Sequence, residues 1–263
     1  VLFSVWIQLR GSSWVEAKEG RFRLRAGDWI ALEKDSKPHL QTDRYGVCIG
    51  LALNGEAARI LGRTGDTPLY TGRGRMPLRS ARVAVRLWRE MIAAGSANPS
   101  RPPAQTLRPL LLHLGGVQES ISARLPRCPG RSRSRKRQVI GRRQRARLYL
   151  EGNRDRVVRI SELAELTSFS SWYFSKTFHA LYGESPQAAS ARMRLERAAD
   201  LLDNSQMMIG EVAAASGFDN CCSFARAFRA RYGVSATGYR NAARNLAMAP
   251  LPTLSTVAAR ADS

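Results

Sequence analysis

The side chains best suited to chemistry in this sequence lie in its last third. Trp172, Ser175 and Lys176 are three and four positions apart, so on a helix they share one face. Phe174 and Phe178 share a different, apolar face. The first face offers an indole ring, a hydroxyl and an ammonium group, which can reach base edges and phosphates in a groove of DNA. We therefore predict a nucleic-acid contact surface there.

The same arrangement returns about fifty residues later. Phe224 and Phe228 stand where Phe174 and Phe178 stand in the first copy. A fixed offset with matching core residues indicates one supersecondary unit used twice. The outward positions of the second copy are Cys222, Ala225, Arg226 and Arg229.

Each copy is predicted to be a helix-turn-helix, a short helix followed by a tight turn and a longer second helix. Ser170 is placed to cap the second helix of the first copy, and Gly217 lies where the second copy needs a left-handed turn. The predicted helices are 160–166 and 170–181 in the first copy, and 209–215 and 220–231 in the second.

A single long helix is expected between the copies. Ser185-Pro186 starts it with proline in the first turn, and an apolar stripe follows. Such a helix would hold the two units at a fixed separation. Their second helices could then enter successive major-groove segments about 34 Å apart on one face of a duplex.

These stretches resemble the diagnostic signature of the AraC/XylS family of transcription regulators, over roughly 156–240. The resemblance rests on Leu163-Ala164 through Ser170–Phe178, on Arg194–Ala198 with Leu201-Leu202, and on Ile209–Ala213 through Gly217–Asp219 to Phe224–Phe228. It implies an all-α DNA-binding domain. It also implies base-contacting positions at Trp172, Ser175 and Lys176 in the first unit, and at Cys221, Cys222, Ala225 and Arg226 in the second.

Two positions depart from the family pattern. Cys221-Cys222 stands where the family commonly shows side chains that hydrogen-bond well, and Ala236 stands where it usually shows proline. Thiols are weak donors, so we expect the second unit to read fewer bases and to depend more on Arg226 and on phosphate contacts. The two thiols are interpreted either as small, partly buried side chains or as redox-sensitive groups beside arginines.

The full set of expected DNA contacts therefore covers the start and the outward face of both second helices. It comprises Ser170, Ser171, Trp172, Ser175, Lys176, Asn220, Cys221, Cys222, Ala225, Arg226 and Arg229.

Catalytic and metal chemistry finds little support in the sequence. His39, His113 and His179 are isolated, and no set of two histidines and a carboxylate is present. The four cysteines form no CxxC pair, and neither a nucleophile with its base nor a glycine-rich phosphate loop appears. We expect no metal, no cofactor and no enzymatic activity.

Charge points to a polyanionic partner. Lys and Arg number 42 against 21 Asp and Glu, a net charge of +21, which favours nucleic acid first and an anionic membrane surface second. From Arg124 to Arg147 basic residues recur with no acidic residue between them. We interpret this block either as a solvated linker with a basic helix face over 135–150 or as an anion-seeking segment.

The N-terminal part has the alternation and the glycine breaks of a small β-structure. Phe22–Leu32 is predicted as strand, Ala-Gly-Asp turn and strand, and it resembles the cupin-like ligand-binding halves of AraC-type regulators. Val1–Ile7 lacks a basic lead and a cleavage site, so it is expected to be a strand and not a signal peptide. Leucine-rich helices are expected between 78 and 116, for packing within the domain or for dimerisation.

The sequence thus predicts an α+β, two-domain protein that regulates transcription by sequence-specific DNA binding. The alternatives are a cupin-type enzyme with a DNA-binding appendage and a non-specific basic nucleoid binder. Double-stranded DNA is the expected partner, and a small-molecule effector, RNA polymerase and a second copy of the chain are further candidates. The sequence has no apolar run long enough to span a membrane, so we expect no membrane partner. The cysteine usage fits the cytoplasm.

The predicted division has four parts. They are a cupin-like β-barrel or sandwich with flanking helices for sensing or dimerisation at 1–116, a basic linker at 117–143, the double helix-turn-helix domain at 144–243, and a disordered tail at 244–263.

Overall fold

The computed structural model describes residues 3–53, 69–97 and 103–248. The chain divides into two compact units, 1–193 and 194–263, and each is described by itself. The first unit combines β-sheets and helices, and the second is helical. In the described residues no helix has the length and apolar character that a bilayer crossing requires.

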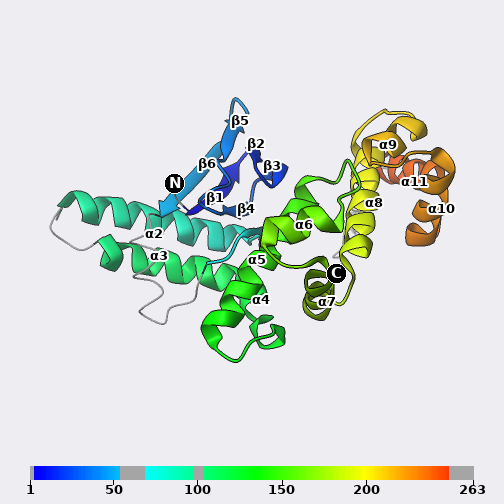
Figure 1. Ribbon diagram of the computed structural model, residues 1–263. Coiled ribbons are helices and arrows are strands. Elements are labelled where there is room, and N and C mark those ends of the chain that lie inside the picture. Colours follow the sequence, from blue (N-terminus) through cyan, green and yellow to red (C-terminus); the bar gives the residue numbers. More distant parts are fainter. Residues whose placement is uncertain (1–2, 54–68, 98–102, 249–263) are drawn as a thin grey trace, which may run out of the picture. The chain divides into compact units, whose positions relative to one another are not determined.

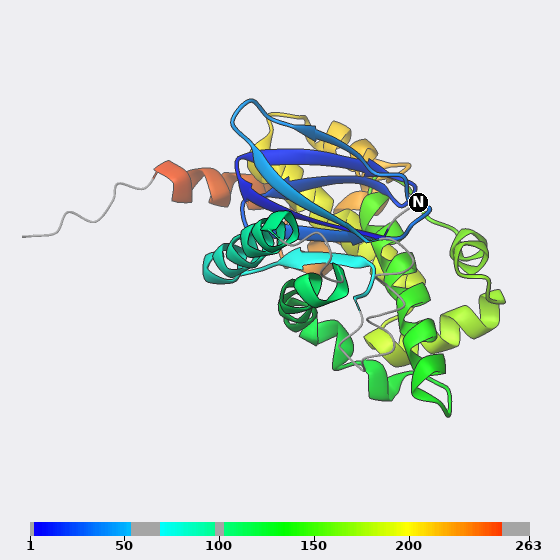
Figure 2. The same ribbon diagram turned by 90° about the vertical axis from the view of Figure 1, so that its left-hand side faces the viewer.

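Two antiparallel sheets make up the N-terminal part of the first unit (Figures 1 and 2). One has the order β6-β1-β4-β7 and the other the order β3-β2-β5. The strands are β1 Phe3–Arg10, β2 Ser12–Ala17, β3 Gly20–Arg25, β4 Asp28–Leu32, β5 His39–Thr42, β6 Val47–Leu53 and β7 Gly72–Arg75.

The core between the sheets follows the period-two alternation of the sequence. Val15 pairs with Phe22 across β2 and β3, and both are buried together with Leu24. They meet Ile30 and Leu32 of β4, which belongs to the other sheet. The described strands therefore form an open two-sheet sandwich, and they do not close into a barrel.

The predicted turn between the strands at 22–32 is confirmed. Gly27 has φ 89°, in the left-handed region that favours glycine, and the Asp28 carboxylate accepts a hydrogen bond from the Arg25 N–H at 2.8 Å. The Gly27 N–H donates to the Gln8 carbonyl of β1 at 2.9 Å, so the turn contacts the strand with which β4 pairs.

Two helices follow the sandwich. α2 Leu78–Ala97 and α3 Pro103–Val117 lie side by side (Figure 1). Leu110, Leu111 and Leu114 are buried, so these three leucines serve packing within this unit, whereas Leu112 is exposed. The short α4 Glu119–Ser122 and a 3-10 helix, Leu125–Arg127, lead on from α3.

The predicted helix over 135–150 is confirmed as α5 Arg133–Gly152, which Ser132 caps by accepting the Arg135 N–H at 3.2 Å. Its C-terminal end touches the sandwich backbone so closely that a Cβ on Gly152 would clash with the Glu19 carbonyl oxygen. Glycine is therefore required at position 152 by space.

Arg145 ties the middle of α5 to the sandwich by an ion-pair network. Its Nε donates to the buried Glu19 carboxylate at 2.8 Å, and its Nη2 donates to Asp35 at 2.9 Å. Burial by itself would raise the pKa of Asp35, but the hydrogen bond and charge of Arg145 outweigh it and lower that pKa. Ser36 Oγ completes the network by donating to Glu19 at 2.9 Å.

We expect Arg145→Ala to destabilise the first unit strongly, because it leaves the Glu19 carboxylate buried without a counter-charge. The expected loss is about 3–5 kcal/mol, measured as a fall in the urea midpoint. Arg135→Ala, on the exposed first turn of the same helix, should change stability by less than about 0.5 kcal/mol. Equal losses in the two variants would contradict a structural role for Arg145.

The remaining helices are α6 Ile160–Thr167, α7 Ser171–Tyr182, α8 Pro186–Asn204, α9 Ile209–Ala215, α10 Cys221–Tyr232 and α11 Ala236–Met248. α6 and α7 belong to the first unit and α9 to α11 to the second, while α8 is one continuous helix across positions 193 and 194. Of the predicted tail, 244–248 is the end of α11, and 249–263 lies outside the described residues.

Candidate nucleic-acid interface

The first predicted helix-turn-helix unit is confirmed in α6 and α7. Phe174 and Phe178 are buried, with ring centres 5.5 Å apart, in a core that also contains Leu163 and Met193. Ser170 caps α7, since its Oγ accepts the Tyr173 N–H at 3.3 Å. The turn before it passes through Ser168, whose φ of 53° is left-handed. The inward side of α7 is therefore fixed by packing.

The outward side of α7 carries the predicted contact residues. Trp172 is 69% exposed, and Lys176 Nζ lies 4.9 Å from the centre of its ring. Ser170 and Ser171 are exposed as well, whereas Ser175 is half-buried. The ring attracts the ammonium group, which at an exposed site is worth about 0.5–1 kcal/mol. This surface can offer an ammonium, an indole N–H and hydroxyls to a partner.

The second unit repeats the construction in α9 and α10. Phe224 and Phe228 are fully buried, 5.4 Å apart, in a core with Val212 and Ala213. The Asn220 side chain caps α10 by accepting the Ser223 N–H at 2.8 Å. Gly217 has φ 72°, so the predicted left-handed turn is confirmed.

The outward side of α10 is exposed at every predicted contact position. These are Asn220, Cys221, Cys222, Ala225, Arg226 and Arg229. The interpretation of the adjacent cysteines as partly buried side chains is wrong, because both lie on the exposed first turn of α10. The core takes up Phe224 and Phe228, four positions apart, and leaves the thiols outside it.

Comparison with known proteins finds a family and relatives that are similar to this chain in sequence. The family described as helix-turn-helix domain matches residues 163–242. The domain is of the AraC type. A probable transcriptional regulator, LumQ of Photobacterium leiognathi, is 30% identical over 92 residues, covering 35% of this chain and 37% of that protein.

Two further proteins are similar over about a third of this chain. The uncharacterized HTH-type transcriptional regulator YobQ of Bacillus subtilis is 37% identical over 31% of this chain and 34% of its own length. A solved structure of a probable AraC family transcriptional regulator from Rhodopseudomonas palustris is 32% identical, with a TM-score of 0.35 over 37% of this chain and 93% of that chain. The chain spans about a third of the curated relatives' length.

Two arginines hold the turns of the AraC-type domain, a role that the sequence did not predict for them. Arg194 Nη1 donates to the Gly217 carbonyl at 2.7 Å, and its guanidinium lies 4.6 Å from the Phe218 ring centre. In the first unit Arg142 Nη1 donates to the Thr167 carbonyl at 3.2 Å and lies 5.2 Å from Phe169. The carbonyls at the end of each short helix lack partners within that helix, so they need outside donors. This need is the signal that could have pointed to Arg142 and Arg194.

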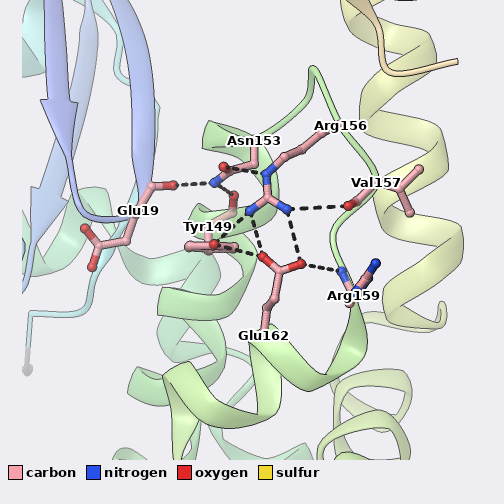
Figure 3. Close-up of polar contacts among 7 residues, drawn as sticks. All are labelled: Glu19, Tyr149, Asn153, Arg156, Val157, Arg159 and Glu162. Atoms are coloured by element: carbon pink, nitrogen blue, oxygen red, sulfur yellow. Dashed lines mark hydrogen bonds and ion pairs between the residues drawn. The ribbon is translucent and has the colours of Figure 1, made fainter. Parts of the chain in front are cut away.

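A polar cluster fixes the start of α6 against α5 (Figure 3). The Glu162 carboxylate accepts hydrogen bonds from Arg156 Nη2 at 2.7 Å, from Tyr149 OH at 3.1 Å and from the Arg159 N–H at 2.9 Å. The Arg156 hydrogen bond is the main reason why the pKa of Glu162 falls from 4.5 to about 2. In the second unit Glu211 accepts the Met208 N–H at 2.7 Å in the same way.

Metal chemistry finds no geometric support in the part of the chain that the structure describes, since no group of three His, Cys, Asp or Glu side chains there could hold an ion.

We expect Glu162 to make the first helix-turn-helix unit, α6 and α7, sensitive to acid. A lowered pKa adds stability that is present above 4.5 and is lost as the pH falls through about 2. Glu162→Gln should cost about 1 kcal/mol at neutral pH, because the partly exposed pair is screened, and it should flatten the acid side of the stability curve. Urea midpoints measured across this range test it.

Glu165→Gln, at an exposed position of the same helix, is the matched control and should keep the wild-type pH dependence. An unaltered acid slope in Glu162→Gln would rule out the carboxylate as its source.

Proposed function

We propose that this protein is a sequence-specific DNA-binding regulator of transcription, in which α7 and α10 enter adjacent major-groove segments. The observation that carries the proposal is the double helix-turn-helix. Each of these helices buries two phenylalanines and presents the opposite, polar and basic side to solvent. The N-terminal part of a recognition helix is the part that reaches base edges.

The contacts divide by chemistry. Trp172, Ser175, Lys176 and Arg226 lie where they would read base edges, and Arg229 lies further along α10, where it suits a phosphate. The helix starts add the remaining contacts, Ser170, Ser171, Asn220, Cys221, Cys222 and Ala225. Exposure of both cysteines supports a role at the interface, where thiols pack against bases and add few hydrogen bonds.

Affinity comes mainly from charge. A net charge of +21 favours phosphate contacts, and each neutralised phosphate steepens the fall of affinity with salt. Charge gives no sequence preference, so specificity rests with the outward faces of α7 and α10.

The proposed division of labour keeps the predicted parts, except that α11 extends the DNA-binding domain to 248. The region 1–116 is a cupin-like sensing or dimerisation domain, 117–143 the basic connection and 144–248 the DNA-binding domain. The two-sheet core of Val15, Phe22 and Leu24 against β4 supports a cupin-like sandwich. A small-molecule effector, RNA polymerase and a second copy are the further partners of this proposal, and the cytoplasm is its location.

We expect Lys176→Ala and Arg226→Ala each to reduce discrimination between selected and random duplexes by about 1–3 kcal/mol, because each removes one base contact. The binding site would first be selected from random DNA and compared with sites mapped across the genome of the native host. Competition binding at one fixed salt concentration then measures the ratio of specific to random affinity.

Arg82→Ala removes the same charge from an exposed position on α2 and should leave the ratio unchanged. Equal affinity of the wild-type protein for every duplex would favour the non-specific nucleoid binder and overturn the proposal. Unchanged discrimination in both variants would remove Lys176 and Arg226 from base readout.

A further inference from the structure

A cavity of about 100 Å³ lies within the first unit, between β7, α4 and α5. Three arginines, Arg73, Arg124 and Arg147, line it together with a single carboxylate residue, Glu151. Gln144 and Glu151 of α5 add an amide and a carboxylate to the lining. Ser120 at the edge is exposed, so the cavity is reached from solvent.

The described residues do not balance the charge in the cavity. Arg147 Nε lies 3.1 Å from one oxygen of Glu151, and Arg73 Nε lies 4.0 Å from the other. Arg124 forms no ion pair with any described residue. Three guanidinium groups therefore share one carboxylate, and two positive charges are left over in a setting where Arg73 and Glu151 are only 24% and 20% exposed.

A buried donor in the same lining also lacks a partner. Gln144 is 4% exposed, and its Nε2 has no hydrogen-bond partner among the described residues. A buried N–H without an acceptor costs free energy, so natural proteins rarely keep one unless a ligand or water supplies the acceptor. Guanidinium forks together with an amide N–H form a donor set that matches the oxygens of an anion.

We propose that this cavity binds a compact divalent oxyanion, of the size of phosphate or a short dicarboxylate, and that the bound anion regulates the first helix-turn-helix unit. The two surplus positive charges set the charge of the ligand. The volume sets its size, since a long acyl chain or a nucleotide exceeds about 100 Å³.

The route to the DNA-binding helix is short. The guanidinium carbons of Arg124 and Arg147 lie 5.3 and 5.2 Å from the ring centre of Tyr182. Tyr182 is the last residue of α7, and its ring lies 4.5 Å from that of Phe178 in the core of this helix. An anion that holds both arginines therefore also fixes the aromatic ring at the end of α7. This regulatory step rests on the proposed function, whereas anion binding does not.

Binding is tested on the full chain without DNA, by calorimetric titration with inorganic phosphate and with malonate at constant ionic strength in chloride. Acetate is the monovalent comparison. We expect one saturable site for the divalent anions, weaker binding of acetate, and a loss of at least about tenfold in affinity in Arg124→Gln and Gln144→Leu. Arg127→Gln is the matched control, because this exposed arginine lies outside the cavity lining.

Absence of saturable binding, or equal weakening in Arg124→Gln and Arg127→Gln, overturns the site. Should Gln144→Leu fail to fold, as judged by circular dichroism, Arg124→Gln and its control decide the question alone.

Regulation is tested by the affinity for a selected DNA site with and without malonate. We expect malonate to tighten DNA binding of the wild type about fivefold or more relative to Arg124→Gln. Equal responses overturn the regulatory step and leave the anion site standing. Saturable anion binding in a protein that does not discriminate between duplexes would instead overturn the proposed function alone.

Discussion

Burial of two phenylalanines four positions apart is the constraint on which both helix-turn-helix units depend. On a helix this spacing places the rings on one side, and Phe174, Phe178, Phe224 and Phe228 are all at most 1% exposed. Because this side is fixed in the core, the opposite side must face outward. The exposure of Trp172 and Arg226 is thus a consequence of where the phenylalanines go.

The compact unit 1–193 has a second constraint, because its helix α5 is shared between two cores. Leu148 of α5 is buried with the strands of the sandwich, whereas Ala146 and Leu150 are buried with Phe174 and Phe178. Side chains two positions apart on a helix point in different directions, so a single helix can serve as the wall of both cores. The sandwich and the first helix-turn-helix unit are therefore packed as one body around α5.

The sequence predicted those features that depend on neighbours along the chain. The period of the phenylalanines, the cap at Ser170 and the left-handed turn at Gly217 are local properties, and the structure has all of them. Several of the residues that the arginines contact lie far away along the chain. Arg145 pairs with Glu19, which is 126 positions away, and no pattern along the chain records that meeting.

Closure of the sheets is likewise a tertiary property, so alternation alone could not separate a barrel from the open sandwich that the described strands form. The predicted partial burial of Cys221 and Cys222 was wrong for a related reason. Small apolar character favours burial in general, but the first turn of α10 lies beyond the reach of its core, and there position overrides residue type.

The basic block between Arg124 and Arg147 shows that net charge alone does not tell which basic residues are available to a polyanion. Arg145 pairs with the buried Glu19 and with the half-exposed Asp35, and Arg142 holds a turn by a carbonyl and an aromatic ring. Neither is a solvated charge, and neither is available to DNA in this arrangement. Arg124 and Arg147 differ again, because they face a cavity and an aromatic ring at the end of α7. Guanidinium suits all these settings since it stacks on rings and donates in several directions at once. The charge that draws the protein to a polyanion is therefore carried by the exposed remainder, and the buried members of the block hold the first DNA-binding unit in shape.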